Sequence, residues 1–209
     1  MKILHTVLAL AIFSVVSSAQ ESKPEQQKSY SPDKKWEFCS DKIVRAGATE
    51  RALQLSDKCG GASGECEPPI WSPDSKRFAL NAPDQGRYQL TSFYQLNGDE
   101  WKEIPLPDAI SDVLAKVIYA RMKKMGLLPK NTPLRLMSNP IRTIEWTDPD
   151  TALLYASDVE GVKDDPDRGF FEASFLFTLK FDQRGECKIV KSQRLSDKER
   201  EKYKKKSEP

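Results

Sequence analysis

The sequence predicts a mainly β fold of antiparallel, blade-like sheets with one inserted amphipathic helix. Three observations support this prediction. A turn signature of an aromatic, Ser or Asp, Pro and Asp recurs at 30–33, 71–74 and 146–150, the last with one extra residue. We call these segments the repeat turns. Alternating apolar and polar residues surround each copy, as is typical of β-strands. Only 108–126 shows apolar residues at clear helical spacing.

The repeat turns combine residue types that build tight turns. A Ser or Asp side chain hydrogen-bonds to the turn backbone, Pro presets one φ angle, and the aromatic supplies area for burial. Pro32 and Pro73 are 41 residues apart, and Pro73 and Pro149 are 76 apart, or two periods of 38. Strand-built periods of this length predict blade-like units. We therefore predict structural roles for Trp71, Pro73, Asp74, Trp146, Pro149 and Asp150.

The N-terminus predicts export to the periplasm or secretion. Lys2 is followed by an apolar run at 3–16 and by small residues at 17–19, which suit cleavage after Ala19. The run is short for a bilayer span, and a retained N-terminal anchor is the alternative. The expected organisation is a signal peptide at 1–19, a disordered lead-in at 20–29, a single β domain at 30–194 with the helix inserted at 108–126, and a charged tail at 195–209.

Four cysteines follow the signal peptide: Cys39, Cys59, Cys66 and Cys187. In an oxidising compartment an even number predicts two disulfides, for which four cysteines allow three connectivities. The Gly-rich segment 60–65 favours a bond between Cys59 and Cys66, which leaves Cys39 to pair with Cys187. No pair has the close spacing of zinc ligands, so we expect disulfides and no metal.

Strands are expected on both sides of the first two repeat turns. Asn97, Gly98 and Asp99 are a strong hairpin signal within the second repeat. Four short strands in about 38 residues correspond to one blade. In the first repeat the strands are predicted near 36–39, 43–44 and 51–55, and in the second at 70–71, 77–82, 87–96 and 101–104.

One helix is expected between the second and third repeats. Pro107 and Asp108 open it, and Gly126 closes it. Its apolar stripe consists of Ile110, Val113, Leu114, Val117, Ile118 and Met122. Such a stripe must be buried, so we expect the helix to pack on its own sheets. Because other positions carry Lys116, Arg121, Lys123 and Lys124, a partner-docking or membrane-surface helix is the alternative.

The third repeat contains the strongest strand signal. In 170–181, Phe171, Ala173, Phe175, Phe177, Leu179 and Phe181 alternate with more polar residues. A strand at 152–156 precedes it and one at 187–190 follows it. We expect an acidic loop at 158–169, between the strands at 152–156 and 170–181.

The pattern of an aromatic, Ser-Pro-Asp, a Lys or Arg and an apolar strand resembles the repeats of TolB-like β-propellers. The resemblance covers about 30–190 without the helix, and it implies an exported interaction domain. The family usually has Gly after the Asp, whereas this chain has Lys34, Ser75 and Thr151, so we expect the left-handed turn position to be lost. Because closed propellers have at least four blades, we expect a partial or open propeller, or a two-layer β fold.

The sequence offers little catalytic chemistry. His5 is the only histidine and lies in the signal peptide, which excludes imidazole catalysis and His-ligated metals from the mature chain. Phosphate-loop and dinucleotide motifs are absent. We therefore predict no enzymatic activity, catalytic residue, metal or cofactor. The alternative is a carboxylate-dependent, carbohydrate-active enzyme. Its candidate carboxylates, each more simply a turn residue, are Asp74, Asp84, Asp148 and Asp150.

The expected function is an exported, non-enzymatic binding or scaffold domain whose partner is another exported protein. The chain carries a net charge of +2 with both signs interleaved, which argues against nucleic acid. After signal cleavage we expect no membrane contact. Calcium is an alternative ligand of the acidic loop, although its spacing matches no EF-hand and a solvated loop is the simpler interpretation. Its acidic residues are Asp158, Glu160, Asp164, Asp165 and Asp167.

Overall fold

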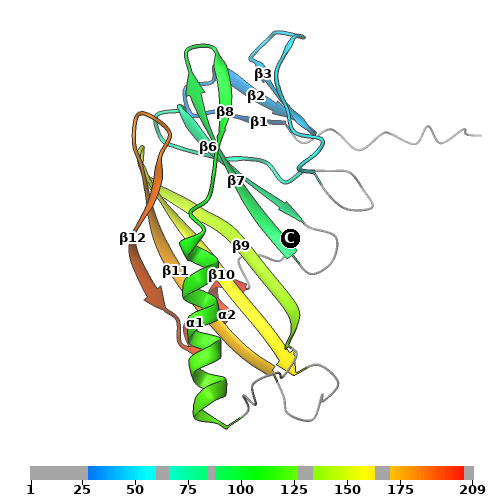
Figure 1. Cartoon of the computed structure of the whole chain (residues 1–209). Coiled ribbons are helices and arrows are strands. Elements are labelled where there is room, and N and C mark those ends of the chain that lie inside the picture. Colours follow the sequence, from blue (N-terminus) through cyan, green and yellow to red (C-terminus); the bar gives the residue numbers. More distant parts are fainter. Residues whose placement is uncertain (1–27, 60–65, 84–87, 127–133, 163–169, 205–209) are drawn as a thin grey trace, which may run out of the picture.

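The computed structural model describes residues 28–59, 66–83, 88–126, 134–162 and 170–204. The predicted signal peptide and residues 20–27 of the lead-in lie outside the described residues. The fold is mainly β, as predicted, with three antiparallel four-stranded units and two helices (Figure 1). In the described part of the chain, no helix has the length and apolar character needed to cross a bilayer.

Each unit consists of four strands that pair antiparallel with their neighbours in sequence. The first contains β1 (Lys28–Tyr30), β2 (Trp36–Cys39), β3 (Lys42–Arg45) and β4 (Arg51–Gln54). The second contains β5 (Ile70–Trp71), β6 (Arg77–Pro83), β7 (Tyr88–Asn97) and β8 (Glu100–Ile104). The third contains β9 (Leu134–Asp148), β10 (Thr151–Val162), β11 (Phe170–Phe181) and β12 (Cys187–Arg194). Each repeat turn joins the first two strands of its unit, so the sequence repeat is a structural repeat.

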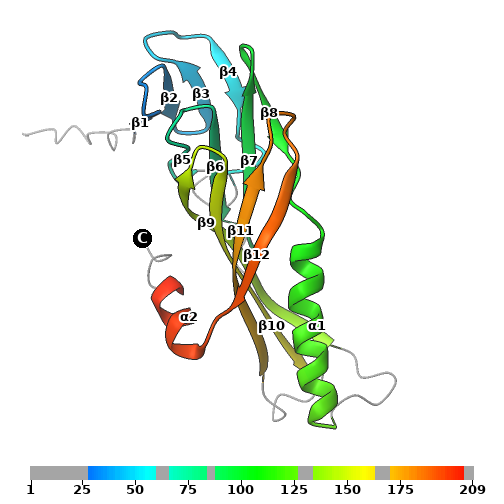
Figure 2. The same cartoon turned by 90° about the vertical axis from the view of Figure 1, so that its left-hand side faces the viewer.

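The second and third units share one sheet. A short parallel pairing places Tyr88 and Gln89 of β7 opposite Asn139 and Pro140 of β9. The strand order is β12-β11-β10-β9-β7-β6-β5, with β8 paired to β7, and the first unit forms a separate sheet. Figures 1 and 2 show the first unit at one end of an elongated molecule and the long strands of the third unit at the other. The described strands do not close into a ring.

Two hydrophobic cores join the units. The first core lies between the first and second units and includes Phe38, Phe78 and Tyr94. The second core joins the second unit to α1 and the third unit and includes Ala79 and Phe93. Successive residues of a strand point to opposite faces, so β6 and β7 contribute to both cores. The second unit is therefore buried on both faces, as a blade between two neighbours would be.

The predicted helix forms α1 (Ala109–Lys124), between the second and third units. Four residues of its apolar stripe, Ile110, Leu114, Ile118 and Met122, are at most 2% exposed in the second core. Gly126 follows the helix, and its positive φ of 68° and its N–H bond to the Lys123 carbonyl (3.1 Å) are typical of the residue after a helix C-terminus. The prediction that the helix packs on its own sheets is confirmed.

A second helix, α2 (Asp197–Lys204), lies on the face of the third unit opposite α1 (Figure 2). Ser196 and Glu199 form a capping box, with the Ser196 N–H donating to the Glu199 carboxylate at 2.8 Å. Arg200 pairs with Glu172 of β11 at 2.6 Å, and the Tyr203 ring stacks 6.1 Å from that of Tyr155. The predicted charged tail therefore begins with a docked helix. At the other terminus, β1 includes the last two residues of the predicted lead-in.

Candidate functional site

The first two repeat turns have the same hydrogen-bond pattern. Ser72 Oγ accepts the Arg77 N–H (2.9 Å) and donates to Asp74 Oδ1 (2.8 Å). Ser31 makes the matching bonds to Trp36 (3.0 Å) and Asp33 (2.8 Å). In both turns the Ser lies at 2% exposure or less, so its hydroxyl replaces water for buried backbone groups.

The left-handed turn position is retained without glycine. Lys34 has φ 60° and Ser75 has φ 61°, so the expectation that this position would be lost is wrong for the first two turns. Their side-chain hydrogen bonds hold the backbone there despite the cost for a residue with a Cβ. The third turn differs: Asp148 pairs directly with Thr151, and Asp148 Oδ1 accepts the Asp150 N–H at 2.8 Å. It is a tighter hairpin than the other two.

The repeat turns also connect the units. The Asp33 N–H of the first turn donates to Ser75 Oγ of the second at 2.9 Å. Arg77, which follows the second turn, is 4% exposed and reaches the third unit. Its guanidinium donates to the Pro149 carbonyl (3.1 Å), Asp150 Oδ1 (2.7 Å), the Asp182 carbonyl (3.0 Å) and Gln95 Oε1 (3.0 Å). One buried cation thus ties the second unit to two turns of the third.

Of the tryptophans of the repeat turns, Trp71 packs against the first core and Trp146 lies in the second. The Trp71 ring lies 5.0 Å from Phe78 beside the first core. Trp146 is in the second core, 5.1 Å from Phe181, and its indole N–H donates to the Ile70 carbonyl at 2.9 Å. These contacts are those of packing residues. The aromatic of the first turn, Tyr30, is 48% exposed and does not supply the expected burial.

Of the two predicted disulfides, the structure contains one. Cys59 and Cys66 are bonded, whereas Cys39 and Cys187 are not joined to each other, which corrects the second pairing. Cys39 belongs to the first unit and Cys187 packs beside the second core, with the second unit between them. Burial raises the pKa of the Cys187 thiol to about 12, so this thiol is protonated at neutral pH.

The candidate carboxylates of an enzyme are engaged in turns. Asp74 and Asp148 accept hydrogen bonds inside their turns, and Asp150 pairs with Arg77. Asp84 lies outside the described residues. Backbone and side-chain hydrogen bonds from Asp150 and Thr151 lower the pKa of Asp148, as expected for a carboxylate that accepts bonds in a turn.

The predicted acidic loop begins as a strand. Asp158 and Glu160 belong to β10, opposite Ala173 and Phe171 of β11 on the face that carries the second core. Asp158 is 6% exposed, and burial raises its pKa and that of Glu160, whose pKa the Asp158 charge raises further. The prediction missed this because carboxylates rarely occupy a core-facing strand position. Asp164, Asp165 and Asp167 lie outside the described residues, which hold no group of three or more potential metal ligands.

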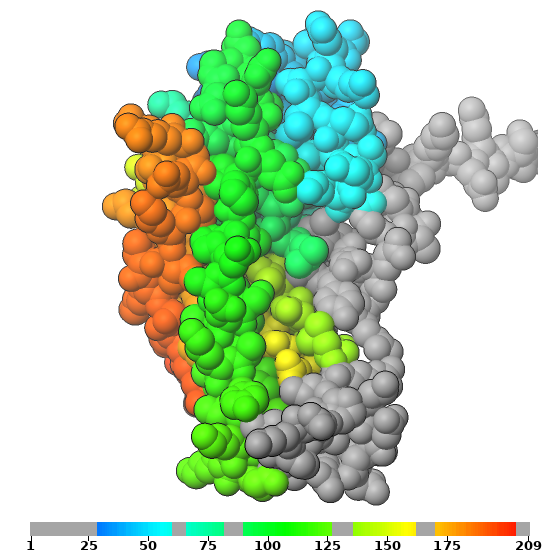
Figure 3. Space-filling model, in the orientation of Figure 1, coloured from blue at the N-terminus to red at the C-terminus, as the bar shows by residue number. Residues whose placement is uncertain are grey.

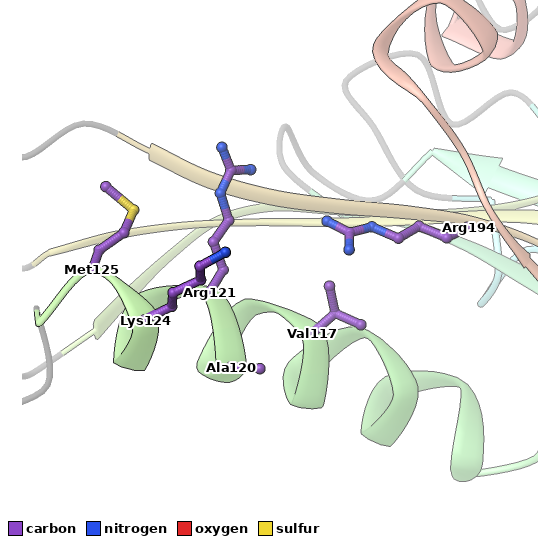
Figure 4. A pocket seen from close by; sticks show the side chains of 6 residues that line it. All are labelled: Val117, Ala120, Arg121, Lys124, Met125 and Arg194. Carbon is purple, nitrogen blue, oxygen red and sulfur yellow. The ribbon is translucent and has the colours of Figure 1, made fainter.

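A groove of about 480 Å³ lies between α1 and β12 (Figure 4). On α1, the groove residues Val117, Ala120, Arg121 and Lys124 are spaced by three and four, so they form one flank of the helix. Met125 at the helix end and Arg194 of β12 complete the lining. Arg194 pairs with Phe175, on the face that carries α1, and its side chain extends past Val117 toward Arg121 (Figure 4). Apolar side chains thus lie among three cations.

The surface around the groove is strongly basic. Residues 109–126 and 187–194 carry seven Lys or Arg residues and one carboxylate, a net charge of +6, whereas the whole chain carries +2. Figure 3 shows α1 beside β12 on one face of the molecule. In the described part of the chain, none of Arg121, Lys124 and Arg194 lies within ion-pair distance of a carboxylate. Within the described residues, the groove therefore carries positive charge that no carboxylate compensates.

A second cavity, of about 330 Å³, lies at the junction of the first and second units. Its lining carries both signs, and two of its cations already have partners: Lys35 pairs with Asp33 at 3.6 Å and Arg45 with Asp99. Charge here is compensated within the chain. The α1–β12 groove is the better candidate for a binding site.

Comparison with known proteins does not identify this chain. No protein-family model matches the sequence, and no curated protein matches it.

Proposed function

We propose that this protein is an exported, non-enzymatic binding or scaffold domain with TolB-like repeats, and that it docks another exported protein at the α1–β12 groove. The observation that carries the proposal is the groove itself, where Val117 and Ala120 lie among three cations without carboxylate partners in the described residues. Exposed apolar surface next to uncompensated charge is typical of a surface that a partner covers.

The scaffold of the groove supports this role. The adjoining side of α1 is anchored by Leu114 and Ile118, both at most 1% exposed. The third unit beneath it is held by α2 on its other face. Side chains on rigid elements bind a partner without losing much conformational entropy.

A scaffold role also agrees with the chemistry of the turns. Asp74 and Asp148 accept N–H groups of the turn backbone and Asp150 accepts from Arg77, so Oδ1 of each carboxylate makes a structural bond. The Asp158 carboxylate faces the second core and lines neither cavity. Because these carboxylates have structural positions, surface recognition is the favoured role.

The test is capture from the exported fraction of the source cells with the mature protein as bait, followed by cross-linking and mass spectrometry. The matched variants are Arg121→Glu with Lys124→Glu in the groove, and Lys42→Glu with Lys102→Glu on the first and second units. We expect one defined partner that the parent protein and the control pair retain and the groove pair loses. Capture that is equal for all three proteins, or absent for all, would contradict the proposal.

A further inference from the structure

We infer that the groove takes an acidic segment of the partner protein, in which carboxylates flank an apolar side chain. This inference rests on the proposed function and specifies the chemistry of its partner. The apolar side chain would lie against Val117 and Ala120. The carboxylates would meet Arg121 and Lys124 on one wall and Arg194 on the other.

Charge complementarity argues for an acidic partner. The α1 and β12 segments carry a net charge of +6 in a chain of net charge +2, so the remaining residues carry −4 together. Complementary charge steers a partner to such a surface and selects against partners of the same sign. Arginine also suits carboxylates, because its planar guanidinium can hold both oxygens of one group.

The shape of the site favours a protein segment over a membrane surface as its ligand. The groove cations Arg121 and Lys124 lie on the flank of α1 that faces β12. Lys116, Tyr119 and Lys123 fall on the helix side opposite the buried stripe, and Tyr119 is 58% exposed. A bilayer would contact this outward side, whereas a chain segment can enter the hollow between two elements. The two modes therefore use different cations of the same helix.

The position of Arg194 adds a second element to the site. It lies about 70 residues after the end of α1, on β12, which is an edge strand of the sheet. A segment that binds between α1 and β12 contacts both elements at once. Loss of Arg194 should therefore weaken binding even though α1 is untouched.

The test uses a fluorescein-labelled synthetic peptide of repeating Asp-Leu-Glu, and fluorescence anisotropy with the mature protein at about 150 mM salt, where charges further than about 8 Å apart are screened. We expect Arg121→Glu with Lys124→Glu to weaken binding at least tenfold, and Arg194→Ser at least threefold. Lys116→Glu with Lys123→Glu makes the same change in net charge outside the groove and should weaken binding by less than twofold. A peptide with Ser in place of Leu should bind at least fivefold more weakly to the parent protein.

Each alternative outcome contradicts the inference. Equal weakening by both Glu pairs would mean diffuse charge attraction without a site. If the parent protein binds phosphatidylglycerol vesicles but not the peptide, and Lys116→Glu with Lys123→Glu abolishes vesicle binding, the helix contacts a membrane. Loss of the partner by the groove pair in the bait experiment, with no binding of the acidic peptide, would refute the acidic segment and leave the proposed function standing. Circular dichroism melts of each variant identify any that fail to fold, and the Arg194→Ser measurement then provides the test without altering α1.

Discussion

Replacing Arg77 tests whether the repeat turns hold the units together. Arg77→Met keeps most of the side-chain volume and removes four hydrogen bonds, three that tie β6 to the third unit and one to Gln95 of β7. Gln95, at 5% exposure, would lose the guanidinium that its side-chain oxygen accepts from. The carbonyls of Pro149 and Asp182 belong to exposed turn residues and can bind water instead.

The expected loss follows from these exposures. An unsatisfied buried acceptor costs about 1–3 kcal/mol, and hydrogen bonds to a charged group contribute about 1.5–3 kcal/mol each before hydration of the exposed partners. The Asp150 side chain is 53% exposed, so its ion pair with Arg77 is partly screened. We therefore expect Arg77→Met to lower the free energy of unfolding by about 3 kcal/mol, somewhat less than for a fully buried pair.

Arg45→Met is the matched control. Arg45 pairs with Asp99, but its side chain is 59% exposed and it lies over Trp36 at 5.3 Å. An exposed pair with one cation–π contact contributes about 1 kcal/mol or less. Urea unfolding followed by tryptophan fluorescence measures both variants. Equal losses for the two substitutions would refute the role of Arg77 as a link between units.

Three further predictions concern stability. Burial raises the folded-state pKa of Asp158 above its ordinary value of 3.8, so the native state loses stability as pH rises from about 4 to neutrality. In urea titrations, Asp158→Asn should therefore stabilise the protein at pH 7 but not below pH 4. Lys34→Gly should stabilise by about 0.5–1 kcal/mol in the same assay because it relieves the positive φ, whereas Ser75→Gly should gain less because it also removes a hydrogen bond between turns. Leu114→Asp should lower the free energy of unfolding by more than about 3 kcal/mol or prevent folding. Tyr119→Asp, on the exposed side of the same helix, should lower it by less than about 1 kcal/mol. Equal losses for the two variants would contradict the packing of α1.

Local patterns predicted most of the fold. Phe171, Phe175 and Phe177 alternate with more polar residues and indeed face the second core. The stripe of α1 was visible because a period of 3.6 residues needs no knowledge of the partner surface. Local alternation failed for β10, which continues to Val162 because β11 pairs with it as far as Gly161 and β9 as far as Val162. Strand pairing is a long-range property that local alternation does not contain.

Side-chain roles that depend on distant residues were also missed. Lys34 and Ser75 adopt positive φ because hydrogen bonds across each turn hold the backbone, and no single residue type signals this. The pairing of Cys39 with Cys187 was inferred by elimination, and the arrangement of the units places them in different parts of the fold.

The sequence indicated only the part of the candidate site that lies on α1. The basic residues of α1 were apparent, but their division between a groove flank and an outward side depends on where β12 lies. Arg194 joins the groove only because the third unit folds its last strand back beside α1. No local pattern marks a residue whose role comes from an element about 70 positions away.

The most direct measurement places the photo-cross-linker p-benzoylphenylalanine at Ala120, which lines the groove, and at Lys123, which lies on the outward side of the same helix. After irradiation in the exported fraction, mass spectrometry identifies the attached chain and its site. We predict that position 120 cross-links to a segment with carboxylates around an apolar residue, and that position 123 does not. Cross-links at 123 alone, or to lipid, would contradict the claim that the α1–β12 groove docks a protein partner.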